Sequence, residues 1–137
     1  MSTPAAKVVV FSCNWDGLSC VEAAAQRGIS YPSSVRVVRL TCLSRLHHGL
    51  ILKAFEVGAD GVMLLGCEPD RCQFGIDAAL VEEECDRARM ILRLLGLRDD
   101  RLVLARVTRG DGAGFVDRLT SFMAGIEQMD SVATGGA

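Results

Sequence analysis

Residues 7–12 of the chain read KVVVFS and residues 61–66 read GVMLLG, and both runs are almost continuously apolar. Short runs rich in Val and Leu are typical of β-strands. Continuous rather than alternating apolarity indicates that a strand is buried on both faces, as in parallel sheets whose crossover helices cover each side. These two runs therefore predict the centre of a parallel α/β sheet.

Two further runs and four amphipathic segments complete the pattern. Residues 35–40 (VRVVRL) and 102–108 (LVLARVT) are also predicted strands. Apolar residues at helical spacing predict helices over residues 17–27, 45–57, 76–95 and 114–129. Because strands and helices alternate, we predict one small flavodoxin-like α/β domain: a four-stranded parallel sheet with crossover helices and the strand order 2-1-3-4.

The length and charge of the chain limit the classes of function. A chain of 137 residues, 50% hydrophobic and 23% charged, fits a single domain, which we place at residues 7–129 between an N-terminal tail (1–6) and a disordered C-terminal tail (130–137). A formal net charge of -2 disfavours nucleic acid as a partner. We expect no membrane span and a cytoplasmic location, because no apolar run approaches roughly 20 residues and residues 1–7 lack a signal-peptide core.

Four of the six cysteines follow the predicted strands. Cys13 directly follows the first strand, Cys42 lies two residues past the second, and Cys67 directly follows the third. Cys72 lies in the next loop, where Pro69 prevents continuation of the strand. Because the carboxyl ends of parallel strands share one edge, where ligands bind in such sheets, we predict that these four cysteines share one site.

Four converging thiolates suit either zinc or an iron-sulfur cluster. A structural zinc is expected to use tight C-x-x-C pairs and to staple a domain short of core, whereas this chain has ample apolar sequence. We therefore predict a [2Fe-2S] cluster, which takes four cysteines, although the spacings match neither common ferredoxin pattern. A thiol-disulfide or redox-sensing protein, using Cys13 with Cys20 or Cys67 with Cys72, and a structural adaptor without a cluster stay open as alternatives.

Other candidate residues are expected to have structural roles. Cys20 and Cys85 are predicted core residues, with Cys20 kept as an alternate ligand because it lies one helical turn past the first strand end. His47 and His48 are expected on the surface, since neighbours in a helix point about 100° apart and at most one could face the site. Trp15 is expected to shield a cluster or to fill a partner's pocket, unless it belongs to the core.

Several motifs occur in a fixed order along residues 8–126. They are Cys13-Asn14-Trp15, Tyr31-Pro32, Val35-Arg36-Val37-Val38-Arg39, Cys42-Leu43-Ser44-Arg45, Ile51-Leu52-Lys53-Ala54-Phe55, Gly58-Ala59-Asp60-Gly61-Val62, Gly66-Cys67 and Cys72-Gln73-Phe74. Together they resemble the delta subunit of methyl-viologen-reducing hydrogenase. The resemblance implies an electron-transfer component of an oxidoreductase complex, without substrate chemistry of its own. Such a component links a hydrogenase or another donor to an FAD-containing, heterodisulfide reductase A-like partner.

The same resemblance implies cluster ligands among Cys13, Cys42, Cys67 and Cys72, with one departure from the family pattern. The family's first motif reads C-N-W-C, and this chain has Asp16 in place of the second cysteine. Asp16 is predicted to be the N-cap of the following helix, its carboxylate accepting an amide proton. A site that lacks one thiolate either holds the cluster with the remaining four or is empty.

Overall fold

The structure of the protein is a computed structural model that describes residues 5–71 and 78–135. Four strands form one sheet in the order β2-β1-β3-β4, and every neighbouring pair is parallel. The strands are β1 (Val8–Cys13), β2 (Val35–Leu40), β3 (Gly61–Cys67) and β4 (Leu102–Val107). The predicted fold class and strand order are therefore confirmed.

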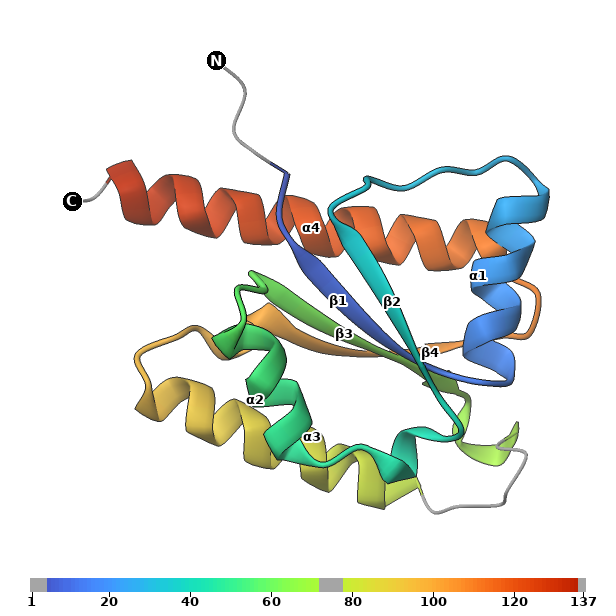
Figure 1. Cartoon of the computed structure of the whole chain (residues 1–137), viewed down its shortest axis with the longest axis horizontal. Coiled ribbons are helices and arrows are strands. Elements are labelled where there is room, and N and C mark those ends of the chain that lie inside the picture. The colour runs from blue at the N-terminus through green and yellow to red at the C-terminus, as the bar shows by residue number, and fades with distance from the viewer. Residues whose placement is uncertain (1–4, 72–77, 136–137) are drawn as a thin grey trace.

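Two helices cover each face of the sheet (Figure 1). The helices are α1 (Asp16–Gln26) and α4 (Gly112–Gly135) on one face, with α2 (His48–Glu56) and α3 (Ala78–Leu94) on the other. Short 3-10 turns are η1 (Leu43–Arg45), η2 (Pro69–Arg71) and η3 (Asp99–Arg101). Within the described residues, no helix combines the length and apolarity needed to cross a bilayer.

The two central strands are the most buried part of the chain. All residues of β3 are buried, and β1 is buried except for Val9, which is partly exposed. Alternate residues of β1 face opposite cores: Val8 and Val10 pack with α1 and α4, whereas Phe11 packs with α2 and α3. This two-sided burial is the physical reason for the continuous apolar runs.

The helix predicted over residues 45–57 is wrong at its start. Turn η1 ends at Arg45, and α2 begins only at His48. His47 is in an extended conformation (φ -97, ψ 146) and its ring accepts a hydrogen bond from the amide of Gly49, so it caps α2 instead of belonging to it. The buried Leu46 anchors the link between the two segments.

The ends of α3 and α4 also differ from the sequence predictions. Four residues on the predicted stripe of α3 are buried, but Leu95, one residue past the end of α3 at Leu94, is 66% exposed. The buried four are Val81, Cys85, Ala88 and Leu92. Helix α4 continues past Met129 to Gly135. The assignment of residues 130–137 to a separate tail stays a prediction.

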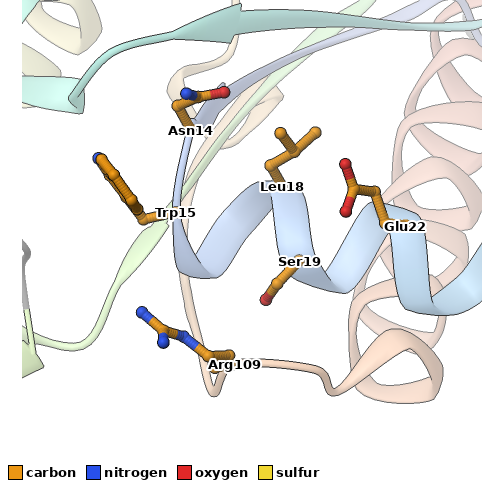
Figure 2. A pocket seen from close by; sticks show the side chains of 6 residues that line it. All are labelled: Asn14, Trp15, Leu18, Ser19, Glu22 and Arg109. Carbon is orange, nitrogen blue, oxygen red and sulfur yellow. The ribbon is translucent and has the colours of Figure 1, made fainter.

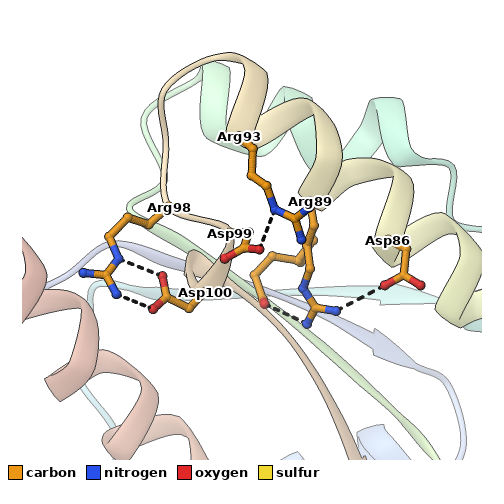
Figure 3. A network of polar contacts seen from close by, with 7 residues as sticks. Asp86, Arg89, Arg93, Arg98, Asp99 and Asp100 are labelled. Carbon is orange, nitrogen blue, oxygen red and sulfur yellow. Dashed lines mark hydrogen bonds and ion pairs between the residues drawn. The ribbon is translucent and has the colours of Figure 1, made fainter.

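A network of arginines and aspartates connects α3 to the start of β4 (Figure 3). Arg93 Nε lies 2.7 Å from Asp99 Oδ2, and Arg98 pairs with Asp100 at 2.8 Å. Arg89 donates to the carbonyl of Leu102 at 3.1 Å, which ties the first residue of β4 to the helix. The contacts of Arg93 and Arg89 therefore link α3 to the turn and first residue that lead into the edge strand.

Candidate metal-binding site

Two thiols meet at the carboxyl edge of the central strands. Cys13 ends β1 and Cys67 ends β3, and these strands are neighbours in the sheet. Both cysteines are buried, and their Sγ atoms lie 3.6 Å apart. Parallel pairing produces this contact, because both strands finish at the same edge. We call these two residues and their surroundings the cysteine edge.

The separation of the two sulfur atoms indicates which chemistry suits them. A disulfide would require about 2.05 Å. A tetrahedral metal with metal-sulfur bonds of about 2.3 Å holds two thiolates about 3.7 to 3.8 Å apart. Cys13 and Cys67 are both free, and their Sγ atoms lie 3.6 Å apart, which is close to the separation of two thiolates on one tetrahedral metal. The observed separation is that of a thiol-thiol hydrogen bond, and it is also compatible with two ligands of one tetrahedral metal.

The N-terminus of α1 lies against both sulfur atoms. The amide of Gly17 donates to Cys13 Sγ at 3.1 Å, and the backbone amide of Asp16 favours the thiolate form of Cys67. Gly17 is required for this approach, since a Cβ there would lie 2.7 Å from both the Leu65 carbonyl oxygen and Ser12 Oγ. Amide donors and the positive end of a helix stabilise negative charge on sulfur.

Burial dominates the acidity of Cys67. Burial, together with the neighbouring Cys13, raises the pKa of the Cys67 thiol to about 12 against the opposing effect of the Asp16 amide. Without a metal, Cys67 is therefore a protonated thiol at neutral pH. A metal that binds there must displace this proton, so its apparent affinity rises with pH.

Cys42 follows β2 at the same end of the sheet. It is buried and directly precedes η1, which packs against β1 and β3. Leu43 lies over Gly66, where an added Cβ would come within 2.5 Å of Leu43 Cδ1. Among the described residues, Cys42 does not form a group with Cys13 and Cys67 whose ligand atoms all lie within 4.8 Å of one another. The fourth predicted ligand, Cys72, lies outside the described residues.

The other two cysteines are core residues. Cys85 is 1% exposed in the core beneath α3, so its predicted burial is confirmed. Cys20 is fully buried in the core formed with α1 and α4, and its thiol donates to the carbonyl of Thr108 at 3.1 Å. Burial raises the pKa of both thiols. Cys20 therefore packs in a different core from Cys13 and Cys67.

Asp16 does not cap α1, so the sequence prediction is wrong on this point. Trp15 is the N-cap residue and makes no side-chain capping bond, while Asp16 is the first residue of the helix. The Asp16 carboxylate is 2% exposed and accepts a hydrogen bond from Arg109 Nε at 2.9 Å. This ion pair joins the start of α1 to the loop after β4. No sequence pattern points to Arg109, because the two partners are far apart along the chain.

An open pocket of about 300 Å³ adjoins the start of α1 (Figure 2). Its lining comes from the turn after β1, from α1 and from the loop after β4: Asn14, Trp15, Leu18, Ser19, Glu22 and Arg109. Trp15 is 37% exposed, so it is not a core residue. Exposed Trp and Arg are enriched among residues that dominate binding energy in protein interfaces.

The two histidines lie together, contrary to expectation. As neighbours in one helix, His47 and His48 would point about 100° apart. Because His47 is instead the extended N-cap, its ring centroid lies 3.9 Å from that of His48. The carboxylate of Glu84, from α3, joins them, and no sequence motif pointed to this residue.

The fold and the cysteine edge together define a class: a small parallel α/β domain that presents soft sulfur donors beside a helix N-terminus. The chain belongs to the family of the methyl-viologen-reducing hydrogenase delta subunit, whose model matches residues 8–130. The family resemblance inferred from the sequence motifs is therefore confirmed.

Relatives of the chain are components of redox complexes. It is 31% identical over 109 residues to the iron-sulfur D subunit of the vhc F420-non-reducing hydrogenase of Methanococcus voltae, covering 80% of this chain and 76% of that protein. It is 28% identical over 122 residues to the corresponding vhu protein of Methanocaldococcus jannaschii, covering 89% and 91%. It is also 29% identical over 127 residues to the A subunit of ferredoxin:CoB-CoM heterodisulfide reductase of Methanosarcina mazei, covering 93% of this chain but only 16% of that protein.

Proposed function

We propose that the chain is a cytoplasmic iron-sulfur protein that transfers electrons between a donor enzyme, such as a hydrogenase, and an FAD-containing, heterodisulfide reductase A-like partner. Cys13, Cys42, Cys67 and Cys72 would hold a [2Fe-2S] cluster. The observation that carries the proposal is the pair of free thiols on β1 and β3, 3.6 Å apart.

The residues at the cysteine edge fit such a cluster. Each iron of a [2Fe-2S] centre takes two protein ligands, and the Cys13–Cys67 pair has the spacing of two ligands on one metal. Cys42, which is buried at the same end of the sheet, would belong to the second pair. Asp16, which replaces the family's additional cysteine, is engaged with Arg109 and is not among the proposed ligands.

The bound cluster would supply one-electron redox chemistry, and the protein needs no acid, base or nucleophile of its own. The chain's own groups hold and tune the site. The amides of Gly17 and Asp16 stabilise negative charge on the sulfur atoms, which favours the reduced form. Arg106 donates to the carbonyl of Cys67 at 3.1 Å and adds positive charge beside the site.

The relatives support the proposed partners. In Methanosarcina mazei, the stretch similar to this chain is a small part of a longer heterodisulfide reductase polypeptide. In that protein, a domain similar to this chain is part of the A subunit of heterodisulfide reductase. This covalent arrangement supports a heterodisulfide reductase A-like protein as the partner of this chain. The similarity to hydrogenase iron-sulfur proteins favours a hydrogenase-like donor. Trp15 and Arg109 at the open pocket offer a docking surface next to the thiols.

Anaerobic reconstitution with iron and sulfide tests the proposal. We expect about two irons and two acid-labile sulfides per chain, with visible absorbance that bleaches on reduction. Cys67→Ser should lose them, whereas Cys85→Ser, which alters a buried cysteine beneath α3, should retain them. Absence of iron and sulfide from the wild-type protein, or equal loading of the two variants, would contradict the proposal.

A dithiol-disulfide function is the second candidate, and the same pair of thiols favours it. Closing a Cys13–Cys67 disulfide would release two protons and pass two electrons to an oxidant such as a disulfide. The structure places Cys13 beside Cys67 rather than beside Cys20. A colourless protein that loses two titratable thiols with oxidised glutathione would support this candidate over the cluster.

A further inference from the structure

Three ligand-type side chains meet where α2 begins. His47 and His48 come from the start of α2, and Glu84 comes from the middle of α3. One ligand atom of each lies within 4.8 Å of the other two. His48 Nδ1 is 2.8 Å from Glu84 Oε2, and the two imidazole rings lie side by side. None of these groups belongs to the cysteine edge.

Local structure holds the three groups in place. Glu84 Oε2 also accepts a hydrogen bond from the amide of His48 at 2.8 Å, and Arg87 holds Oε1 at 2.7 Å. The carboxylate is therefore oriented from both sides, with Oε2 turned toward the histidines. Gly49 donates its amide to His47 Nδ1 at 2.9 Å, which fixes the ring of the N-cap residue.

We propose that His47, His48 and Glu84 form a binding site for a divalent transition-metal ion of the zinc type. Two imidazoles and one carboxylate are a three-ligand set for zinc, with the fourth position left to water. The nitrogen and oxygen donors of this site differ chemically from the sulfur donors of the cysteine edge. The ion would join α2 to α3 within the helical layer that covers one face of the sheet (Figure 1).

Binding requires small movements. The ion would replace the proton between His48 Nδ1 and Glu84 Oε2, which stand 2.8 Å apart. Ligands about 2.0 to 2.1 Å from a tetrahedral ion lie about 3.3 Å apart, so the two atoms need to separate by about half an ångström. His47 would exchange its bond with the Gly49 amide for the ion. Arg87 remains on Oε1, where it opposes the added positive charge without occupying the metal-facing oxygen.

The chain has only two histidines, and both lie in this cluster. Imidazole NMR signals therefore report on this site without interference from metal bound to cysteines. Zinc ions are titrated into the 15N-labelled full chain, and long-range proton-nitrogen spectra of the rings are recorded. We expect both rings to shift together and saturate at one zinc ion for this site. The same shifts should occur in Cys67→Ser.

Two variants and one control complete the test. Glu84→Gln should weaken zinc binding at least about tenfold, as should His47→Gln, which replaces the exposed N-cap residue of α2. Glu83→Gln removes an exposed carboxylate one residue away and should bind zinc like the wild type. Unshifted rings, movement of one ring only, loss of the shifts in Cys67→Ser, or equal affinity in His47→Gln and Glu83→Gln would overturn the proposal.

Discussion

Replacing Gly17 by alanine tests how closely α1 must approach the cysteine edge. The new Cβ would lie 2.7 Å from the Leu65 carbonyl oxygen and 2.7 Å from Ser12 Oγ. It would also lie 3.2 Å from Cys13 Sγ. Two of these distances are shorter than any tolerated carbon contact, and one involves the backbone of the central strand. The helix must therefore move away from β1 and β3.

Overpacking of this kind costs about 1 to 3 kcal/mol of folding free energy. The higher helix propensity of alanine returns up to about 1 kcal/mol, so we expect a net loss of up to about 2 kcal/mol. Urea unfolding of the metal-free protein measures this difference directly. The displaced helix also withdraws the Gly17 amide from Cys13, so the variant should take up less iron on reconstitution.

Gly125→Ala is the matched control. Gly125 lies inside α4, and an added Cβ there meets no atom within 4 Å. Without a clash, the alanine should stabilise the protein by about 0.5 to 1 kcal/mol. The two glycine variants should therefore change stability in opposite directions. A Gly17→Ala protein that is as stable as Gly125→Ala and loads iron normally would refute this reasoning.

Three further predictions concern charged and ionisable groups. Asp16→Asn should lower the free energy of unfolding by about 1 to 2 kcal/mol, because the buried side chain loses its charge-assisted bond to Arg109. The control Glu22→Gln, on the exposed side of α1, should change the free energy of unfolding little, and urea unfolding compares the two variants. The raised pKa of Cys67 predicts that the metal-free protein loses stability as pH rises from 9.0 toward about 12, because the thiol ionises first in the unfolded chain. The stability of Cys67→Ala should depend less on pH over this window. The hydrogen bonds from the His48 ring and amide lower the pKa of Glu84 to about 2. The stabilising effect of the Glu84 carboxylate should therefore persist as pH falls to 4.5, its ordinary pKa, and fade at lower pH. Carboxyl NMR should find a Glu84 titration midpoint well below 4.5, and a midpoint at 4.5 would contradict these hydrogen bonds.

The fold was predictable because burial leaves a direct mark on sequence. The continuous apolar runs of β1 and β3 reflect helices on both faces, and alternation of strands with helices limits the strand order to few choices. The contact of Cys13 with Cys67 follows from the same logic, because each ends one of two adjacent parallel strands.

The remaining details depend on contacts that no local pattern encodes. The apolar period of Leu46, Leu50 and Ile51 continues through His47, so it conceals the break at which that histidine becomes an N-cap. The ion pair of Asp16 with Arg109 depends on how the loop after β4 folds back onto α1. The position of Glu84 beside the histidines depends on how α3 is rotated against α2.

X-ray absorption at the iron edge of the anaerobically reconstituted protein tests the central claim most directly. Thiolates of the cysteine edge that hold a [2Fe-2S] cluster predict a first shell of sulfur only and a second iron nearby. A first shell of oxygen or nitrogen, or a sample that retains no iron, would contradict the claim.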